Sequence, residues 1–199
     1  MKKIILFLIT ASLTINLYSQ IIEESKIMRR LAEHAESLTK DQVTYVSAYH
    51  KIKYPMGDIP ANIGCCVDVI IRAYRKVGID LQQLVHEDMR DNFDEYPKIW
   101  GLTQTDTNID HRRVPNLMKF FERNGDTREI NKDPGNYHPG DVVCWDLGSV
   151  KHIGMVSTVK SKEDPNRYLI VHNIGNGQVL EDCLFTWKII GHYMYYTKR

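Results

Sequence analysis

A cysteine at a predicted helix start carries the clearest chemical signal in the chain. Cys66 opens the apolar run CVDVIIRAYRKV, and Gly78, the residue type that commonly follows a helix end, closes it. A helix N-terminus lowers a thiol pKa because unpaired backbone N–H groups and the helix dipole favour the thiolate. The backbone N–H of Cys66 could also face a developing oxyanion. The sequence therefore predicts a nucleophilic thiol at position 66.

Such a nucleophile needs a base, and His152 is the candidate. It opens a predicted strand at a sheet end, where an imidazole could meet a helix terminus. A third polar group should hold that imidazole in one tautomer, and either His172 or Asn173, at the end of the next strand, is placed to do so. We assign this role to His172 and keep Asn173 as the alternative.

The elements that must position these side chains follow an α+β order. Helical periodicity or apolar runs precede the strand patterns, which indicates N-terminal helices packed on an antiparallel β-sheet. The expected helices are 21–38, 66–77, 81–93 and 114–123, and the expected strands are 141–145, 152–159, 168–173 and 189–197. Residues 51–64 and the Gly-rich stretch 175–177 are expected as loops.

The first nineteen residues have the pattern of a secretory signal peptide. Lys2 and Lys3 precede an apolar stretch that is shorter than the roughly 20 residues needed to cross a bilayer. We expect cleavage before Gln20, no stable membrane insertion afterwards, and a periplasmic or secreted protein. Residues 20–199 are then expected to form one domain, acting as a monomer.

Charge and composition exclude some partners. Lys plus Arg number 26 and Asp plus Glu number 25, so no strongly basic surface for nucleic acid is expected. No tight metal-ligand motif is present, and we assign neither a metal nor a cofactor.

The remaining cysteines leave their pairing open. Export would permit disulfides, yet Cys65 adjoins Cys66, and Cys144 and Cys183 lie in apolar or aromatic surroundings typical of a core. One of the adjacent pair could be structural or disulfide-bonded while the other stays free.

Three short motifs resemble the NlpC-type papain-like cysteine peptidases that cut bacterial cell-wall peptides. They are the helix-start Cys66, the segment PGDVV at 139–143, and HIGMV at 152–156. The resemblance implies a papain-like fold and a Cys66, His152, His172 triad. Tyr54 matches the tyrosine that the family carries about a dozen residues before its nucleophile, where it helps line the site.

A longer resemblance, over residues 25–196, is to YijF-like exported bacterial proteins of unknown function. It rests on stretches such as GCCVDVIIRAYRKVGIDLQQL, NIDHRRVPNLMKFF and PGDVVCWDLG. Compared with the peptidases, residues 79–136 form an insertion that is expected to build one wall of the groove.

We expect five residues to contact substrate: Tyr54, Asp68, His111, Arg112 and Asn173. Arg112 could capture a stem-peptide carboxylate, or it could belong to an internal ion-pair network with Asp110.

The sequence thus favours a hydrolase, an amidase or endopeptidase, acting on a peptidoglycan stem peptide or another peptide. Two alternatives stay open: a non-catalytic cell-wall peptide-binding module with the same cleft, and an exported antibacterial effector.

Overall fold

The computed structural model describes residues 2–196, and their side chains from Gln20 onward. Its α-helices are α1 (Lys2–Leu38), α2 (Cys66–Lys76), α3 (Leu81–Asp91) and α4 (Val114–Asn124), with short 3-10 helices η1 (Phe93–Glu95), η2 (Asp110–Arg112) and η3 (Pro134–Asn136). Its strands are β1 (Thr44–Tyr45), β2 (Ile63–Gly64), β3 (Asp126–Thr127), β4 (Val142–Asp146), β5 (Lys151–Lys160), β6 (Tyr168–Asn173), β7 (Gln178–Glu181) and β8 (Lys188–Met194).

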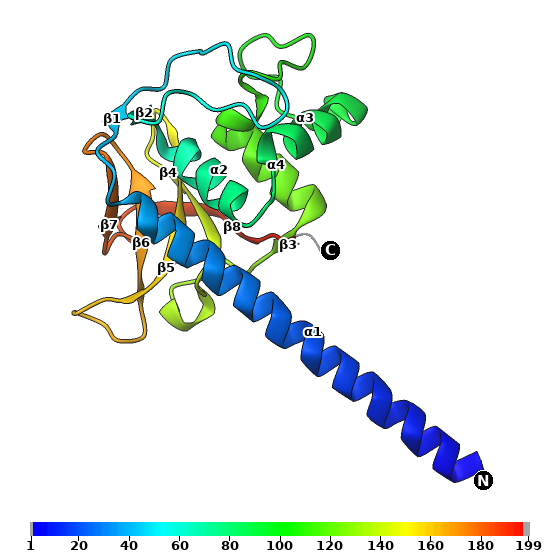
Figure 1. The fold of residues 1–199 in the computed structure, drawn as a ribbon. Coiled ribbons are helices and arrows are strands. Elements are labelled where there is room, and N and C mark those ends of the chain that lie inside the picture. The colour runs from blue at the N-terminus through cyan, green and yellow to red at the C-terminus, as the bar shows by residue number, and fades with distance from the viewer. Residues whose placement is uncertain (1, 197–199) are drawn as a thin grey trace.

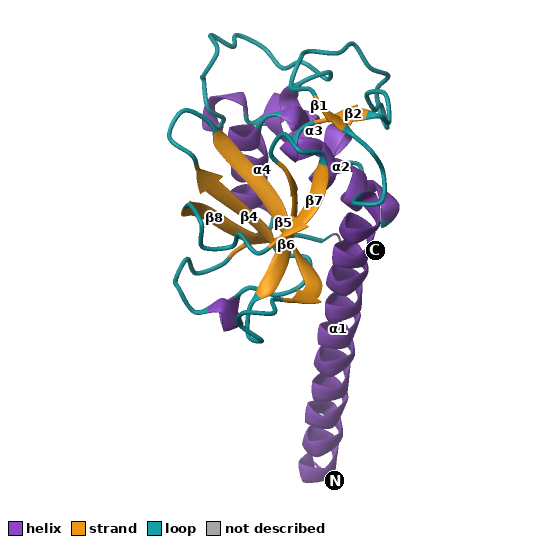
Figure 2. Ribbon diagram, turned by 90° about the vertical axis from the view of Figure 1, so that its left-hand side faces the viewer, coloured by secondary structure: helices purple, strands orange, loops and turns teal. Residues whose placement is uncertain are grey.

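Six strands form one antiparallel sheet in the order β3-β8-β4-β5-β6-β7, and β1 pairs with β2 in a separate parallel ribbon. The helices gather on one side of the sheet, with α2 between α1 and α4 (Figure 1). Seen from the side, the strands run next to one another while α1 extends along the edge of the body (Figure 2). The start of α2 and the start of β5 therefore come from different layers.

The central strand β4 is buried on both faces. Val142 and Cys144 pack into the core beneath the helices, while Val143 and Trp145 pack into a second core on the opposite face. Successive side chains of a strand point to opposite faces, so an unbroken apolar run suits a strand covered on both sides. The second core is closed by Tyr137, Val156, Ile170, Cys183 and Leu184.

Helix α1 packs against the sheet through its C-terminal half. Its inward side chains are fully or nearly buried, and they are Met28, Leu31, Ala32, Ala35 and Leu38. The carboxylate of Glu36 accepts hydrogen bonds from both the backbone N–H (2.6 Å) and the hydroxyl (2.8 Å) of Thr158 in β5. The N-terminal turns of α1 project away from this contact (Figure 1).

Within the described residues, no helix combines the length and the apolarity that crossing a membrane requires. The signal peptide, its cleavage before Gln20, and the single domain at 20–199 remain predictions. Met1 and residues 197–199 lie outside the described residues, so position 197 of the predicted last strand does too.

The α+β order of helices followed by an antiparallel sheet is confirmed. The predicted helix at 21–38 forms the C-terminal part of α1, and those at 66–77, 81–93 and 114–123 appear within a few residues as α2, α3 and α4. The predicted strands appear as β4, β5, β6 and β8. The sequence patterns missed β1, β2 and β3, which have two residues each, and β7, which follows the Gly-rich loop.

The segment at 79–136, predicted to be an insertion, contains α3, α4 and three short 3-10 helices, and it packs against α2 through α3 and η2. It brings charged side chains towards the start of α2, where Cys66 lies.

Gly140 offers a stability test of the contact between α1 and the β4 turn. It has φ +92°, and a Cβ there would lie 2.4 Å from the carbonyl oxygen of Met28, whereas Gly148 has φ +87° with nothing within 4 Å. We expect Gly148→Ala to cost about 1–2 kcal/mol of backbone strain, and Gly140→Ala to cost about 1–3 kcal/mol more through overpacking. Urea unfolding followed by circular dichroism measures both; equal losses would contradict the close approach.

Candidate active site

The start of α2 is held by a reciprocal cap between Cys65 and Asp68. Cys65 is the N-cap residue, and its backbone N–H donates to a carboxylate oxygen of Asp68 at 2.7 Å. The N-cap side chain in turn accepts from the backbone N–H of Asp68, which completes a capping box. Cys66 is thereby fixed as the first residue of the helix, where its own N–H lies outside the intrahelical hydrogen-bond pattern.

Asp68 also forms a buried ion pair with Arg112 of η2. The guanidinium donates to both carboxylate oxygens, at 2.9 and 3.0 Å, and both side chains are at most 3% exposed. A further bond runs from Arg112 to the carbonyl oxygen of Ala48 at 3.0 Å. Although burial opposes ionisation, these hydrogen bonds and the Arg112 charge hold the pKa of Asp68 below its usual value.

The structure pairs Asp68 and Arg112 with each other, and their contact with substrate stays a prediction. Their charged atoms face each other in the interior. Of the two hypotheses for Arg112, capture of a substrate carboxylate or an internal ion pair, the structure shows an internal ion pair. Its partner is Asp68, while Asp110 instead contacts His86 at 3.1 Å.

Two imidazoles form a relay beside Cys66. Nε2 of His152 lies 2.9 Å from Nδ1 of His172, and Nε2 of His172 lies 3.0 Å from a carboxylate oxygen of Glu181. Since Nε2 of His152 is turned to His172, Nδ1 is the nitrogen left to act on Cys66, whose thiol pKa His152 lowers. One set of protons satisfies every contact: His152 Nε2–H donates to His172, and His172 Nε2–H donates to Glu181. This leaves Nδ1 of His152 free to take the thiol proton.

Two tryptophans enclose the imidazole pair. The ring of His152 lies 5.8 Å from that of Trp145 and 5.9 Å from that of Trp187, and His172 lies 6.2 Å from Trp187. Both imidazoles are buried. Burial lowers the pKa of His172, with the neighbouring charge of His152 acting in the same direction, so His172 is held neutral.

The pKa values of the two adjacent thiols, Cys65 and Cys66, are shifted in opposite directions. The hydrogen bond from Cys65 lowers the pKa of Cys66, and the hydrogen bond and charge of His152 and the backbone N–H of Ile153 lower it further against the effect of burial. The same Cys65–Cys66 contact, together with burial and the Asp68 carboxylate, raises the pKa of Cys65. Cys66 is thus the thiolate of the pair, and Cys65 its proton donor.

The other predicted site residues lie apart from this relay. Tyr54 stacks edge-on against His86, with ring centroids 5.3 Å apart, and its hydroxyl faces Glu87 at 3.5 Å. His111 is buried, and burial lowers its pKa to about 3, so it stays neutral in the interior. The structure gives neither residue a contact with Cys66.

Asn173 is close to the site without touching His152. Its side-chain amide donates to the carbonyl oxygen of Gly64 at 3.3 Å, which ties the end of β6 to β2 just before the nucleophile. Of the two candidates for the third position, His172 is the one that contacts His152.

Three residues at the site were missed by the sequence analysis. Tyr45 pairs with Gly64 through the β1–β2 ribbon, and its phenol pKa rises to about 12 because of burial and then the nearby charges of Cys66, Cys65 and Asp68. Glu181 and Cys183 flank His172. Two-residue strands and a short strand behind glycines have too few positions for a periodic pattern, so no signal placed these side chains.

All four cysteines are buried free thiols, so the pairing that the sequence left open is not observed. Cys144 lies in the core beneath the helices, and Cys183 contacts His172 at 3.6 Å.

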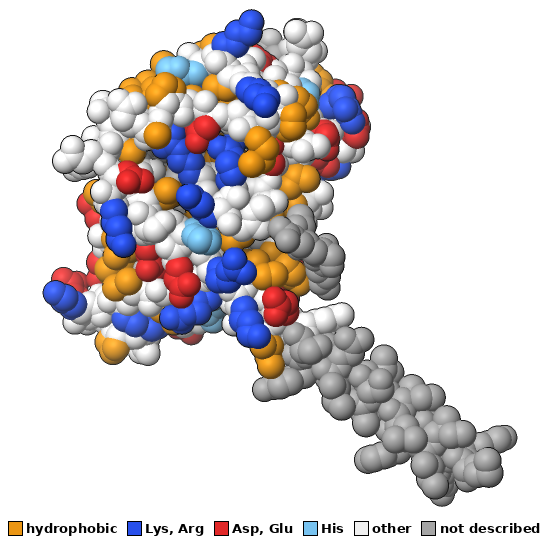
Figure 3. Space-filling model, in the orientation of Figure 1, with side chains coloured by type: hydrophobic (Ala, Val, Ile, Leu, Met, Phe, Trp, Pro, Cys, Tyr) orange, Lys and Arg blue, Asp and Glu red, His pale blue; other side chains and the backbone are white. Residues whose placement is uncertain are grey.

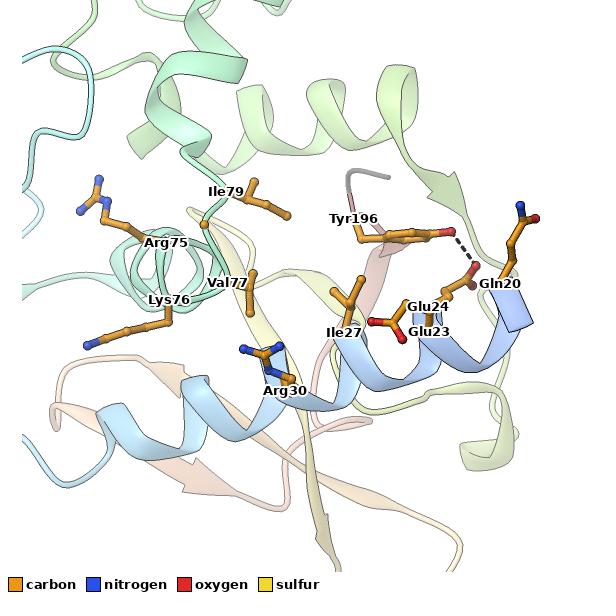
Figure 4. A pocket seen from close by; sticks show the side chains of 11 residues that line it. Gln20, Glu23, Glu24, Ile27, Arg30, Arg75, Lys76, Val77, Ile79 and Tyr196 are labelled. Atoms are coloured by element: carbon orange, nitrogen blue, oxygen red, sulfur yellow. Dashed lines mark hydrogen bonds between the residues drawn. The ribbon is translucent and has the colours of Figure 1, made fainter. Parts of the chain in front are cut away.

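One cavity in the described part of the chain lies away from Cys66. It measures about 660 Å³ and is bounded by the middle turns of α1 between Gln20 and Arg30, the C-terminal end of α2, and Tyr196, whose hydroxyl donates to Glu24 at 2.8 Å (Figure 4). An eleven-residue helix is about 16 Å long, so this cavity is separated from Cys66 by the length of α2. On the face drawn in Figure 3, basic and acidic side chains are interspersed, as the near-neutral composition predicts.

Comparisons with known proteins bear on the family and the fold. The family model described as "Domain of unknown function (DUF1287)" matches residues 32–195. The Escherichia coli (strain K12) protein described as "Uncharacterized protein YijF" is 46% identical over 169 residues, which are 84% of this chain and 82% of that protein.

Two solved structures of an N-acetylmuramoyl-L-alanine amidase from Bacteroides uniformis are similar in fold. One is 12% identical with a TM-score of 0.52, covering 84% of this chain and 97% of the amidase chain. The other is 13% identical with a TM-score of 0.49, covering 86% and 100%. At this identity, the likeness of the first is one of fold.

Breaking the buried ion pair should destabilise the protein strongly. Asp68→Asn leaves the Arg112 charge buried without a partner, and we expect a loss of about 3–5 kcal/mol in the free energy of unfolding. The exposed Arg29–Glu33 pair on α1 is the control, and Glu33→Gln should cost at most about 0.5 kcal/mol. If Asp68→Asn does not fold, Asp68→Asn with Arg112→Met should recover soluble protein. Equal small losses at both pairs would contradict the assignment.

The opposite pKa shifts predict selective alkylation of Cys66. Because its pKa is lowered, its thiolate should persist to lower pH than that of an ordinary thiol, whose pKa is about 8.5. Iodoacetamide labelling, with each cysteine read separately by tandem mass spectrometry, should therefore show a midpoint below that value for Cys66. His152→Gln should move the midpoint upward. Labelling of Cys65 ahead of Cys66 would reverse the assignment.

Proposed function

The chain belongs to the DUF1287 family, and from that premise we propose that it is a cysteine hydrolase that cleaves amide bonds of cell-wall peptides. The observation that carries the proposal is the hydrogen-bonded series of His152, His172 and Glu181, whose first member lowers the pKa of the Cys66 thiol. The fold likeness to an N-acetylmuramoyl-L-alanine amidase supports peptidoglycan as the source of the substrate.

The same proposal includes a papain-like, NlpC-type arrangement of the site. A helix-start cysteine facing a histidine at the beginning of a strand of the antiparallel sheet is the arrangement that the motifs around Cys66 and His152 imply. The sheet order supports it, since β5 and β6 are neighbours and place His152 and His172 side by side.

In the first half of the reaction, the Cys66 thiolate attacks the carbonyl carbon of the amide, and the carbonyl electrons move onto oxygen. The backbone N–H of Cys66 is placed to stabilise that oxyanion, and loss of one such donor typically costs about 2.7–4 kcal/mol in the barrier. The protonated His152 then gives its Nδ1 proton to the leaving nitrogen as the C–N bond breaks, which leaves a thioester on Cys66.

In the second half, water attacks the thioester carbonyl and His152 accepts its proton at Nδ1. The C–S bond breaks, the product leaves as a carboxylic acid, and Cys66 returns as the thiolate. His172 keeps Nε2 of His152 protonated throughout, because its own Nδ1 is the acceptor of that hydrogen bond. Glu181 acts through His172 and is a positioning residue.

Tyr45 is the tyrosine we assign to the substrate side of the site. Its side chain is 39% exposed, and its raised pKa keeps the hydroxyl protonated, so it is able to donate to a substrate oxygen.

Export completes the proposal. With residues 1–19 acting as a leader that is removed before Gln20, the hydrolase would reach peptidoglycan in the periplasm or outside the cell and act there as a monomer. Among the α1 side chains that the structure describes, from Gln20 onward, the first buried one is Met28, and the contact of α1 with the sheet lies in the part that removal of the leader would retain.

Mass analysis of muropeptides tests the reaction. Isolated peptidoglycan incubated with the protein should yield new muropeptides whose masses differ by the addition of water at one amide bond. Cys66→Ala should lower the rate by about 10⁴-fold or more, because the nucleophile is lost.

Cys144→Ala is the matched control. It also removes a buried thiol, from the core cluster that contains Cys66, but leaves Cys66 and His152 in place. This variant should therefore release the same muropeptides as the unchanged protein. Unchanged cleavage by Cys66→Ala would remove the nucleophile assignment. Binding of peptidoglycan without any new product would favour the non-catalytic binding module.

A further inference from the structure

The far side of His172 gathers three metal-binding side chains. Nε2 of His172 lies 3.0 Å from an Oε of Glu181 and 3.6 Å from Sγ of Cys183, and the three ligand atoms all lie within 4.8 Å of one another. They come from β6, the end of β7, and the turn that follows it. We propose that His172, Glu181 and Cys183 bind one Zn²⁺ ion, or a similar thiolate-binding divalent metal, and that the bound metal switches off His152.

The separation of the nitrogen and sulfur ligand atoms fits tetrahedral zinc. Zinc bonds of about 2.0–2.1 Å to nitrogen and 2.3 Å to sulfur place those two ligand atoms about 3.6 Å apart at a tetrahedral angle. The observed separation of the His172 nitrogen and the Cys183 sulfur is 3.6 Å. The corresponding nitrogen–oxygen separation is about 3.4 Å, so the Glu181 oxygen would move outward by about 0.4 Å.

Two of the three ligands are buried, and the third is open to solvent. His172 and Cys183 are at most 5% exposed, and the His172 ring is held beside Trp187. The Glu181 side chain is 45% exposed, so it supplies both the adjustment and the route from solvent. Three protein ligands leave the fourth tetrahedral position for water.

Coordination requires two changes in proton position. The thiol of Cys183 gives its proton to water and binds as the thiolate, and Nε2 of His172 binds through its lone pair. The Nε2 proton of His172 therefore leaves, and the neutral ring carries its proton on Nδ1 instead. No oxidant or reductant is involved.

The proton on Nδ1 of His172 reverses the hydrogen bond to His152. Nε2 of His152, 2.9 Å away, must then accept rather than donate, because two N–H groups cannot face each other at that distance. The neutral ring of His152 holds its proton on Nδ1, towards Cys66. It can no longer accept a proton from the thiol or from the attacking water, so the metal-bound protein lacks a base.

The inhibitory role depends on the proposed hydrolase function, whereas the metal site does not. The two are separated by measuring binding in a protein that lacks the nucleophile.

Cobalt supplies the probe for binding. Titration of Cys66→Ala protein with Co²⁺ should give the near-ultraviolet thiolate-to-cobalt charge-transfer band, saturating at one equivalent. The band should disappear when Cys183→Ala is added and should persist with Cys144→Ala. A band that survives Cys183→Ala, or the absence of any band, would overturn the site.

Iodoacetamide labelling of Cys66 supplies the probe for coupling. In the otherwise unchanged protein, Zn²⁺ should slow labelling at least tenfold, and a chelator should restore the rate. In the Cys183→Ala protein, Zn²⁺ should have no such effect. Equal slowing in both proteins would show that zinc binds Cys66 and His152 directly and would overturn the switch. If Cys66 labels slowly without zinc while the cobalt band is present, the proposed function fails and the metal site stands.

Discussion

The carboxylate of Asp68 is the constraint on which the candidate site depends. It fixes the first turn of α2 by accepting from the Cys65 backbone and pairs with Arg112 in an environment from which water is excluded. A buried charge of this kind is tolerated only with a hydrogen-bonded partner. The segment at 79–136 is therefore more than an addition to the fold, since its η2 supplies the cation that pairs with Asp68.

Much of this arrangement could be predicted from the sequence because it depends on local patterns. The apolar run after Cys66 and the glycine that follows it define a helix, and the largely apolar stretch after His152 defines a strand. A thiol at a helix start and an imidazole at a strand start suit the roles of a nucleophile and its base, which predicts that they lie together. The structure adds that β5 and β6 are neighbours in the sheet, which brings His172 into contact with His152.

The remainder depends on tertiary contacts that leave no periodic trace. Arg112 finds Asp68 across 44 positions, and nothing local distinguishes it from Arg113. Tyr45 reaches the site through a two-residue ribbon, while Tyr54, which matches a family motif, turns towards α3. Glu181 lies on a strand too short to show alternation. Side chains of this kind are identified by what they touch rather than by their spacing.

The enclosure of His152 between Trp145 and Trp187 also has a kinetic consequence. A ring bounded by two indoles cannot turn over about its Cβ–Cγ bond unless the aromatic packing opens first. Ring flipping is therefore coupled to local breathing of the protein, whereas proton hopping between nitrogens is not. For as long as the indoles remain closed, the two ring nitrogens therefore keep separate partners, with Nε2 towards His172 and Nδ1 towards Cys66.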